Sequence, residues 1–142
     1  MNKARIAAAL ISLTTAEAST AQSSDPNALL GQKTWAAFQC AALAANARNE
    51  KERERLFTAG YESGTAFLTA LRSGNIKPED ILSRVPMGVM LKVAGPNIDF
   101  VLGRIWEAAS ENALREVFEL KDEEGRVLAA NKGFVKRNCG QM

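Results

Sequence analysis

Apolar residues recur every three or four positions along most of this chain, which is the spacing of an amphipathic helix. The first such stretch covers residues 28–47 and carries two neighbouring stripes, made of Trp35, Phe38 and Ala42 and of Ala36, Cys40, Leu43 and Ala47. The second stretch covers residues 57–71 and has Phe57, Gly60, Tyr61, Gly64, Phe67, Leu68 and Leu71 at the same intervals. This pattern predicts two long helices, with Cys40 on the buried side of the first.

Two glycines one helical turn apart mark the second predicted helix. Gly60 and Gly64 each cost up to about 1 kcal/mol relative to alanine inside a helix. In a membrane this spacing would indicate helix dimerisation, but the polar residues around the glycines exclude a bilayer here. We therefore expect another helix to approach closely at both positions. Gly74 is the residue type that favours a left-handed helix exit, so the helix should end there.

Between these two helices, residues 48–55 alternate in charge sign. Glu50 with Arg53, and Lys51 with Glu54, have the i,i+3 spacing of pairs on a helix surface. The segment is typical of a solvated helix start or an interhelical loop. An interaction tail is the functional alternative, but mixed signs produce little net field.

The sequence pattern in the middle of the chain predicts shorter segments. Pro78, Glu79 and Asp80 fit the first turn of a helix, where proline and carboxylates suit the unsatisfied amides and the helix dipole. Glu79 and Asp80 are also conceivable as a catalytic or metal pair, but adjacent residues on a helix diverge. Pro86 should end this helix, and residues 87–95 are expected to form a buried connector, helical or irregular.

The last third predicts one long helix and one short helix. The long helix covers residues 98–120, and its apolar stripe shifts around residues 110–112, so the helix either curves or breaks there. Residues 121–125 should form a polar turn that ends on glycine. Residues 126–139 should form a short helix followed by an extended tail. With no strand-like alternation, the predicted fold class is all-α, a compact bundle of about five helices in a single domain over residues 28–142.

The first 21 residues have the order of a cleaved signal peptide. Lys3 and Arg5 precede an apolar run over residues 6–13, and small residues follow. Cleavage is preferred after Ala21 rather than Ala18, which leaves residues 22–27 as a polar linker. The apolar run is far shorter than the ~20 residues of a bilayer span, so we expect no membrane insertion and a periplasmic or secreted protein. A disordered or amphipathic cytosolic tail is the alternative.

An exported chain with two cysteines is most simply interpreted as having one disulfide, here between Cys40 and Cys139. The bridge would enclose about 100 residues, and a loop of that size stabilises a fold by up to ~4.7 kcal/mol in the chain-entropy model. We therefore expect the disulfide to hold the C-terminal segment against the first helix. Two unrelated thiols are the alternative.

Charge and residue content narrow the possible chemistry. Loss of Lys3, Arg5 and Glu17 would change the net charge from +2 to +1, which gives no reason to expect nucleic acid as a partner. The chain has no histidine, so Ser–His–Asp and Cys–His catalysis and histidine metal sites are excluded. No phosphate-binding glycine loop or CxxC pair is present either. We expect no cofactor, no metal and no enzymatic activity.

Carboxylate chemistry is the one catalytic route that the sequence leaves open. Asp99, Glu107, Glu62 and Glu111 could meet across the fold and work as a pair. Carboxylates on the polar faces of helices are, however, normally solvated.

The segment 99–107 is the best candidate contact surface. Arg104 and Glu107 lie one helical turn apart, and Trp106 lies beside the apolar stripe. Tryptophan and arginine are enriched among the residues that dominate binding interfaces. The sequence favours the structural alternative, in which Trp106 covers the edge of the core and Arg104 pairs with Glu107. Tyr61 and Glu62 form a second, weaker candidate.

Three functions fit these features. The first is an exported, soluble protein-binding module of the bacterial envelope, of which inhibitors and immunity-type proteins are examples, with another protein as its partner. The second is a small-ligand carrier or a carboxylate-based helical enzyme. The third is a structural or chaperone-like envelope component, which would expose a large apolar patch.

Overall fold

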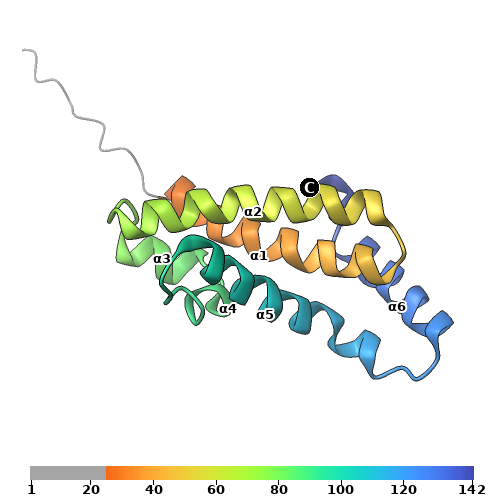
Figure 1. Ribbon diagram of the computed structural model, residues 1–142. Helices are drawn as coiled ribbons and strands as arrows, with labels where there is room; N and C mark the ends of the chain where they lie inside the picture. Colours follow the sequence, from red (N-terminus) through yellow and green to blue (C-terminus); the bar gives the residue numbers. More distant parts are fainter. Residues whose placement is uncertain (1–24) are drawn as a thin grey trace, which may run out of the picture.

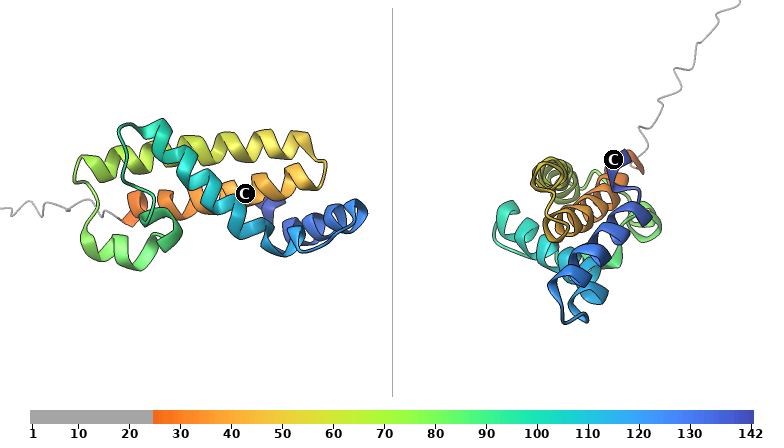
Figure 2. Two further views of the ribbon diagram at one scale, coloured as in Figure 1. Left: turned by 60° about the horizontal axis from the view of Figure 1, so that its bottom comes forward. Right: turned by 90° about the vertical axis from the view of Figure 1, so that its right-hand side faces the viewer.

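A central helix organises the structure, a computed structural model that describes residues 25–142. The elements are α1 (Asp25–Asn46), α2 (Glu50–Arg72), α3 (Pro78–Arg84), α4 (Met87–Met90), α5 (Ile98–Phe118), α6 (Glu123–Lys136) and the short 3-10 helix η1 (Cys139–Gln141). Helix α1 contacts each of the other five α-helices (Figure 1), which lie around it in the end-on view of Figure 2, right. The described residues contain no strand, so the predicted all-α bundle is confirmed.

Helix α1 differs from a one-sided amphipathic helix. Every residue from 37 to 44 is buried, which means that all sides of the helix are covered over these two turns. Alanine dominates this segment, and its small side chain lets neighbouring helices pack closely against the α1 backbone. The sequence stripes identified the helix but did not reveal its complete enclosure.

Helix α2 begins earlier than its apolar stripe. The side chain of Asn49 caps the helix by accepting a hydrogen bond from the Glu52 amide at 3.2 Å, so the charged segment is a solvated helix start. Glu50 and Arg53 form the predicted pair at 2.6 Å. The expected Lys51–Glu54 pair is absent from the ion pairs of residues 25–142.

Both helical glycines of α2 lie at close helix approaches, as predicted. A Cβ atom on Gly60 would lie 2.5 Å from the Phe38 ring of α1, and one on Gly64 would meet side chains of both α1 and α5. Gly74 has a φ of 69°, the left-handed exit expected at the end of this helix.

Helix α5 is continuous, so the shift in its apolar stripe reflects a change of packing partners and not a break. It follows the short helices α3 and α4, which pack at the same end of the bundle as the start of α1 (Figure 1). Pro78 is the first residue of α3, and Val89 of the predicted connector is buried in α4.

Three boundary predictions need correction. The predicted signal peptide, residues 1–21, and residues 22–24 of the predicted linker lie outside the described residues. Residues 25–27 of that linker already belong to α1. Residues 121–125 are not a turn throughout, because α6 begins at Glu123 and the Asp122 side chain caps it through the Gly125 amide at 2.6 Å. The segment after α6 is not extended but forms η1.

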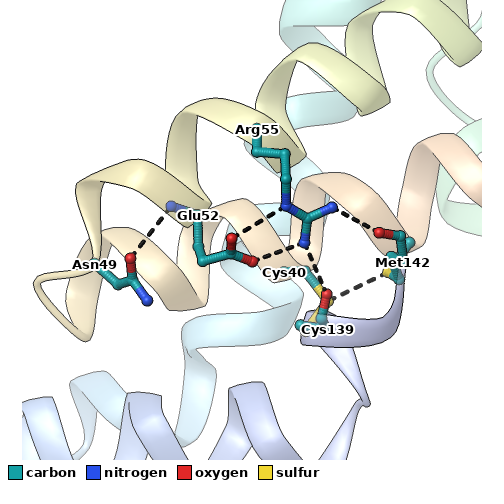
Figure 3. A network of polar contacts seen from close by, with 6 residues as sticks. All are labelled: Cys40, Asn49, Glu52, Arg55, Cys139 and Met142. Carbon is teal, nitrogen blue, oxygen red and sulfur yellow. Dashed lines mark hydrogen bonds and ion pairs between the residues drawn. A yellow bond between two sulfur atoms is a disulfide. The ribbon is translucent and has the colours of Figure 1, made fainter.

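The predicted disulfide joins Cys40 of α1 to Cys139 of η1, with a Cα–Cα distance of 5.5 Å. Both cysteines are buried. Figure 3 shows a second attachment, in which Arg55 donates hydrogen bonds to the main-chain oxygens of Cys139 (3.2 Å) and Met142 (2.6 Å). The Arg55 guanidinium also donates a hydrogen bond to Glu52 Oε2 at 2.7 Å, which holds the guanidinium in place. This hydrogen bond lowers the pKa of Glu52, because it favours the charged carboxylate. The last turn is therefore fixed to both α1 and α2.

None of the helices between residues 25 and 142 combines the length and the apolar character needed to cross a bilayer.

Candidate functional site

A groove runs along the outward face of α5. Its larger hollow, of about 490 Å³, is lined by Gly103, Trp106, Glu107, Ser110, Glu111, Leu114 and Phe118. A smaller hollow of about 140 Å³ is lined by Phe38, Phe57, Tyr61, Asp99, Leu102, Gly103 and Trp106. The two hollows share Gly103 and Trp106, so they form one surface between the middle of α2 and the end of α5, which we call the α5 groove.

Gly103 opens the floor of the α5 groove. A Cβ atom built on it would meet nothing within 4 Å, in contrast to the glycines of α2. The missing side chain therefore leaves free space beside Trp106, where the two hollows join.

Trp106 forms the wall between the groove and the core. Its ring lies edge-on to Phe38 at 5.5 Å and to Phe57 at 5.1 Å between centroids. The half-buried indole also packs against all three clusters of buried residues in the bundle. Trp106 thus covers the edge of the core, as the structural alternative expected, and at the same time offers one side to the groove.

Arg104 does not take part in the α5 groove. Its guanidinium donates a hydrogen bond to the Ala94 carbonyl at 2.6 Å and lies over the Phe100 ring at 5.9 Å. The predicted Arg104–Glu107 pair is wrong, because it is absent from the ion pairs of the described chain. Glu107 instead lines the groove without that counter-charge.

Tyr61 lies at the α2 side of the groove and is bound to Asp99 of α5. Its hydroxyl donates a hydrogen bond to Asp99 Oδ1 at 2.6 Å. This hydrogen bond and the carboxylate charge raise the pKa of Tyr61, since both favour the protonated phenol. Glu62, the other residue of the weaker candidate, is exposed and does not line either hollow.

The groove is acidic at its rim and apolar inside. Asp99, Glu107 and Glu111 are its charged lining residues, and no lysine or arginine lines either hollow. The Ser110 hydroxyl is buried and has no hydrogen-bond partner among the described residues. An unsatisfied buried hydroxyl costs about 1–3 kcal/mol.

Three of the four acidic residues considered for catalysis line the α5 groove, although in different hollows. Asp99 is bound to Tyr61, Glu107 and Glu111 line the larger hollow, and Glu62 lies outside the groove. Residues 25–142 contain no group of three or more metal-ligating side chains placed to hold an ion.

The sequence identified Tyr61, Trp106 and Glu107 as contact candidates and Asp99, Glu107 and Glu111 as candidate carboxylates, and all five line the groove. It did not identify the residues that give the groove its shape. Gly103 and Ser110 belong to no distinctive motif, and Leu114 and Phe118 have the i,i+4 spacing that is typical of a core-facing helix stripe. Leu114 is indeed buried in the core. Phe118 is in fact 59% exposed. The stripe shift in α5 was no signal for the groove, because both stripes are largely buried, the first in one core cluster and the second in another.

The described chain is thus an all-α protein of six α-helices with one long-range disulfide. Comparisons with protein-family models, with curated protein sequences and with solved structures find no match for it. Because no related protein indicates a function, the function proposed for this protein rests on the shape, exposure and charge of the α5 groove.

Proposed function

We propose that this protein is an exported binding module of the bacterial envelope, which holds a partner protein in the α5 groove and performs no chemistry itself. An inhibitor or an immunity-type protein would act in this way. The observation that carries the proposal is an apolar groove with an aromatic wall, an acidic rim and a glycine at its open centre.

The aromatic content of this face supports protein binding. Phe57, Tyr61 and Phe118 are 39%, 41% and 59% exposed, and Trp106 lies between them along the groove. Rigid aromatic side chains that are already partly desolvated supply large contact area at low entropic cost, so they dominate many interfaces. Such exposure is unfavourable in an isolated protein, and a partner would cover it.

The charge of the groove indicates the chemistry of the partner. Because its charged lining residues are all acidic, a segment with lysine or arginine beside apolar residues would fit it best. The elongated shape along one helix suits an amphipathic helix that inserts its apolar side.

Export is supported by the order of charged, apolar and small residues in 1–21 and by compatibility of the disulfide with an oxidising compartment. We expect the mature chain to begin at Gln22. N-terminal mass analysis of protein recovered from its native location tests this expectation, and an intact Met1 there would contradict it.

The binding proposal is tested by filling the groove without disturbing the core. Gly103→Gln places a side chain into the open space, and Gly103→Ala adds only a methyl group. Leu82→Gln, at a residue of α3 that is 84% exposed and outside the groove, is the control for loss of surface apolar area. Trp106→Ala is less informative, since Trp106 also packs in the core.

Each variant is used to recover proteins from envelope extract, which are identified and quantified by mass spectrometry. We expect one stoichiometric partner, recovered equally by wild type and Leu82→Gln and at least about tenfold less by Gly103→Gln, a loss that corresponds to ~1.4 kcal/mol. The proposal would be contradicted if Gly103→Gln recovered the same partner at the wild-type level. It would also be contradicted if no form of the protein recovered a stoichiometric partner.

A further inference from the structure

A second pocket lies on another side of α5, where α5 and α6 diverge over α1. Its volume is about 510 Å³, and it is lined by Leu43, Ala113, Glu116, Val117, Ala129, Lys132, Gly133, Lys136 and Arg137. We call it the α5–α6 pocket. It shares no lining residue with the α5 groove. Its volume falls within the roughly 300–1,000 Å³ that is usual for small-molecule sites.

The inner surface of the α5–α6 pocket is apolar. Leu43 and Val117, which are 1% and 2% exposed, come from α1 and α5. Ala113 and Ala129 face the same space with side chains too short to fill it. Gly133 lets α6 approach α1, because a Cβ atom there would lie 2.9 Å from Leu43 Cδ2. Small residues on both helices therefore leave an apolar hollow under the end of α6.

The outer surface of the pocket is basic. Lys132 and Lys136 are exposed, lie one turn apart on α6, and form no ion pair with residues 25–142. Arg137 donates a hydrogen bond to Gln39 Oε1 at 3.3 Å and holds a third positive charge beside them. Glu116 is the one acidic lining residue. Like charges at i,i+4 repel each other, and an anion between them would relieve that repulsion.

We propose that the α5–α6 pocket binds a small amphiphilic anion, free in solution, whose apolar chain occupies the hollow and whose carboxylate or phosphate lies between Lys132 and Lys136. The basic rim selects the negative head group, and the apolar floor selects the chain. This site is independent of the proposed protein-binding groove, because the two have opposite charge and separate lining residues.

Isothermal titration calorimetry of the full mature chain tests the proposal, with decanoate as the probe below its micelle-forming concentration. Decylamine has the same chain with a positive head group, decyl phosphate has a second negative head group, and inorganic phosphate has no chain. We expect one site for decanoate and for decyl phosphate. Binding of decylamine and of inorganic phosphate should be at least about tenfold weaker.

Two variants locate the site. Lys132→Gln with Lys136→Gln should weaken decanoate binding roughly five- to tenfold, since two ion pairs are lost. The matched control is Lys33→Gln with Lys51→Gln, which removes the same charge from exposed positions of α1 and α2 outside the pocket. Ala129→Leu should fill the hollow and abolish binding.

Several results would overturn the proposal. Equal affinity for decylamine and decanoate would show that the head group is not recognised, and equal affinity for inorganic phosphate would show that the hollow contributes nothing. An unchanged affinity in Ala129→Leu, or an equal loss in the control lysine pair, would place any binding elsewhere. Association with anionic lipid vesicles but not with free decanoate would also contradict the site.

Discussion

At the scale of single residues, the glycines of the long helices serve opposite purposes. Gly60 is surrounded, since a Cβ atom would lie 2.5 Å from the Phe38 ring. Gly103 is open, since a Cβ atom would have no neighbour within 4 Å. The first glycine is therefore required by packing. The second lowers helix stability with no compensating contact inside the described chain, which is expected where a binding surface and not the core determines the residue.

This difference predicts stability changes of opposite sign. Gly103→Ala should raise the free energy of unfolding by about 0.5–1 kcal/mol, because alanine favours the helix and meets no neighbour. Gly60→Ala should lower it by roughly 1–3 kcal/mol, because the new methyl group displaces the Phe38 ring. Urea unfolding of both variants measures the two values. A loss of stability in Gly103→Ala would mean that the groove floor is not open.

The hydrogen bond from Tyr61 to Asp99 predicts a pH effect on the same surface. The folded-state pKa of Tyr61 is raised, so the bond stabilises the fold below the unfolded pKa of about 10, and this stabilisation is lost as the pH rises through the raised folded value. Tyr61 is the chain's single tyrosine, so near-ultraviolet absorbance reports its ionisation alone.

In the native protein, phenolate should form at higher pH than in the urea-unfolded chain. Asp99→Asn should bring the native transition back toward the unfolded one, because the carboxylate charge is removed while an oxygen acceptor remains. Coincident transitions in native wild type and Asp99→Asn would contradict the assigned cause.

At the scale of elements, local sequence signals located most helices. Spacing of apolar residues identified α1, α2 and α5, and Pro78 with its following carboxylates identified the start of α3. The start of α6 was misread because Gly125 was taken as the end of a turn. Asp122 with the acidic pair after it is a helix-start signal, and a single glycine in the first turn does not outweigh it.

The candidate site was less predictable, because it depends on which helix faces meet. Tyr61 and Asp99 lie 38 positions apart, and only the packing of α2 against α5 brings them together. Arg104 was expected to pair along its own helix, yet it turns to the Ala94 carbonyl, an acceptor that spacing within a helix cannot reveal. Trp106 was found because its residue type marks it, whereas Glu107 was found through its spacing from Arg104, although that pair does not form.

At the scale of the whole molecule, α6 depends on its connection at Cys139. Ala130 is its one fully buried residue, and Ala129 and Phe134 are only partly buried against the core, so packing holds α6 less firmly than it holds the longer helices. The disulfide to α1 and the Arg55 hydrogen bonds from α2 fasten the segment that follows it. The α5–α6 pocket, which α6 forms in part, should therefore exist only while this end of the chain is attached.

Removal of the disulfide should accordingly act unevenly on the fold. Cys139→Ser should lower the free energy of unfolding by about 2–5 kcal/mol, because the bridge closes a very long loop and the unfolded chain gains that freedom. Amide hydrogen exchange should accelerate most in α6, while the interior of α1 and α2 keeps its protection relative to global unfolding. Reduced wild type is the matched control and should behave in the same way. Unchanged melting, or uniform loss of protection in all helices, would show that packing and not the disulfide holds α6 in place.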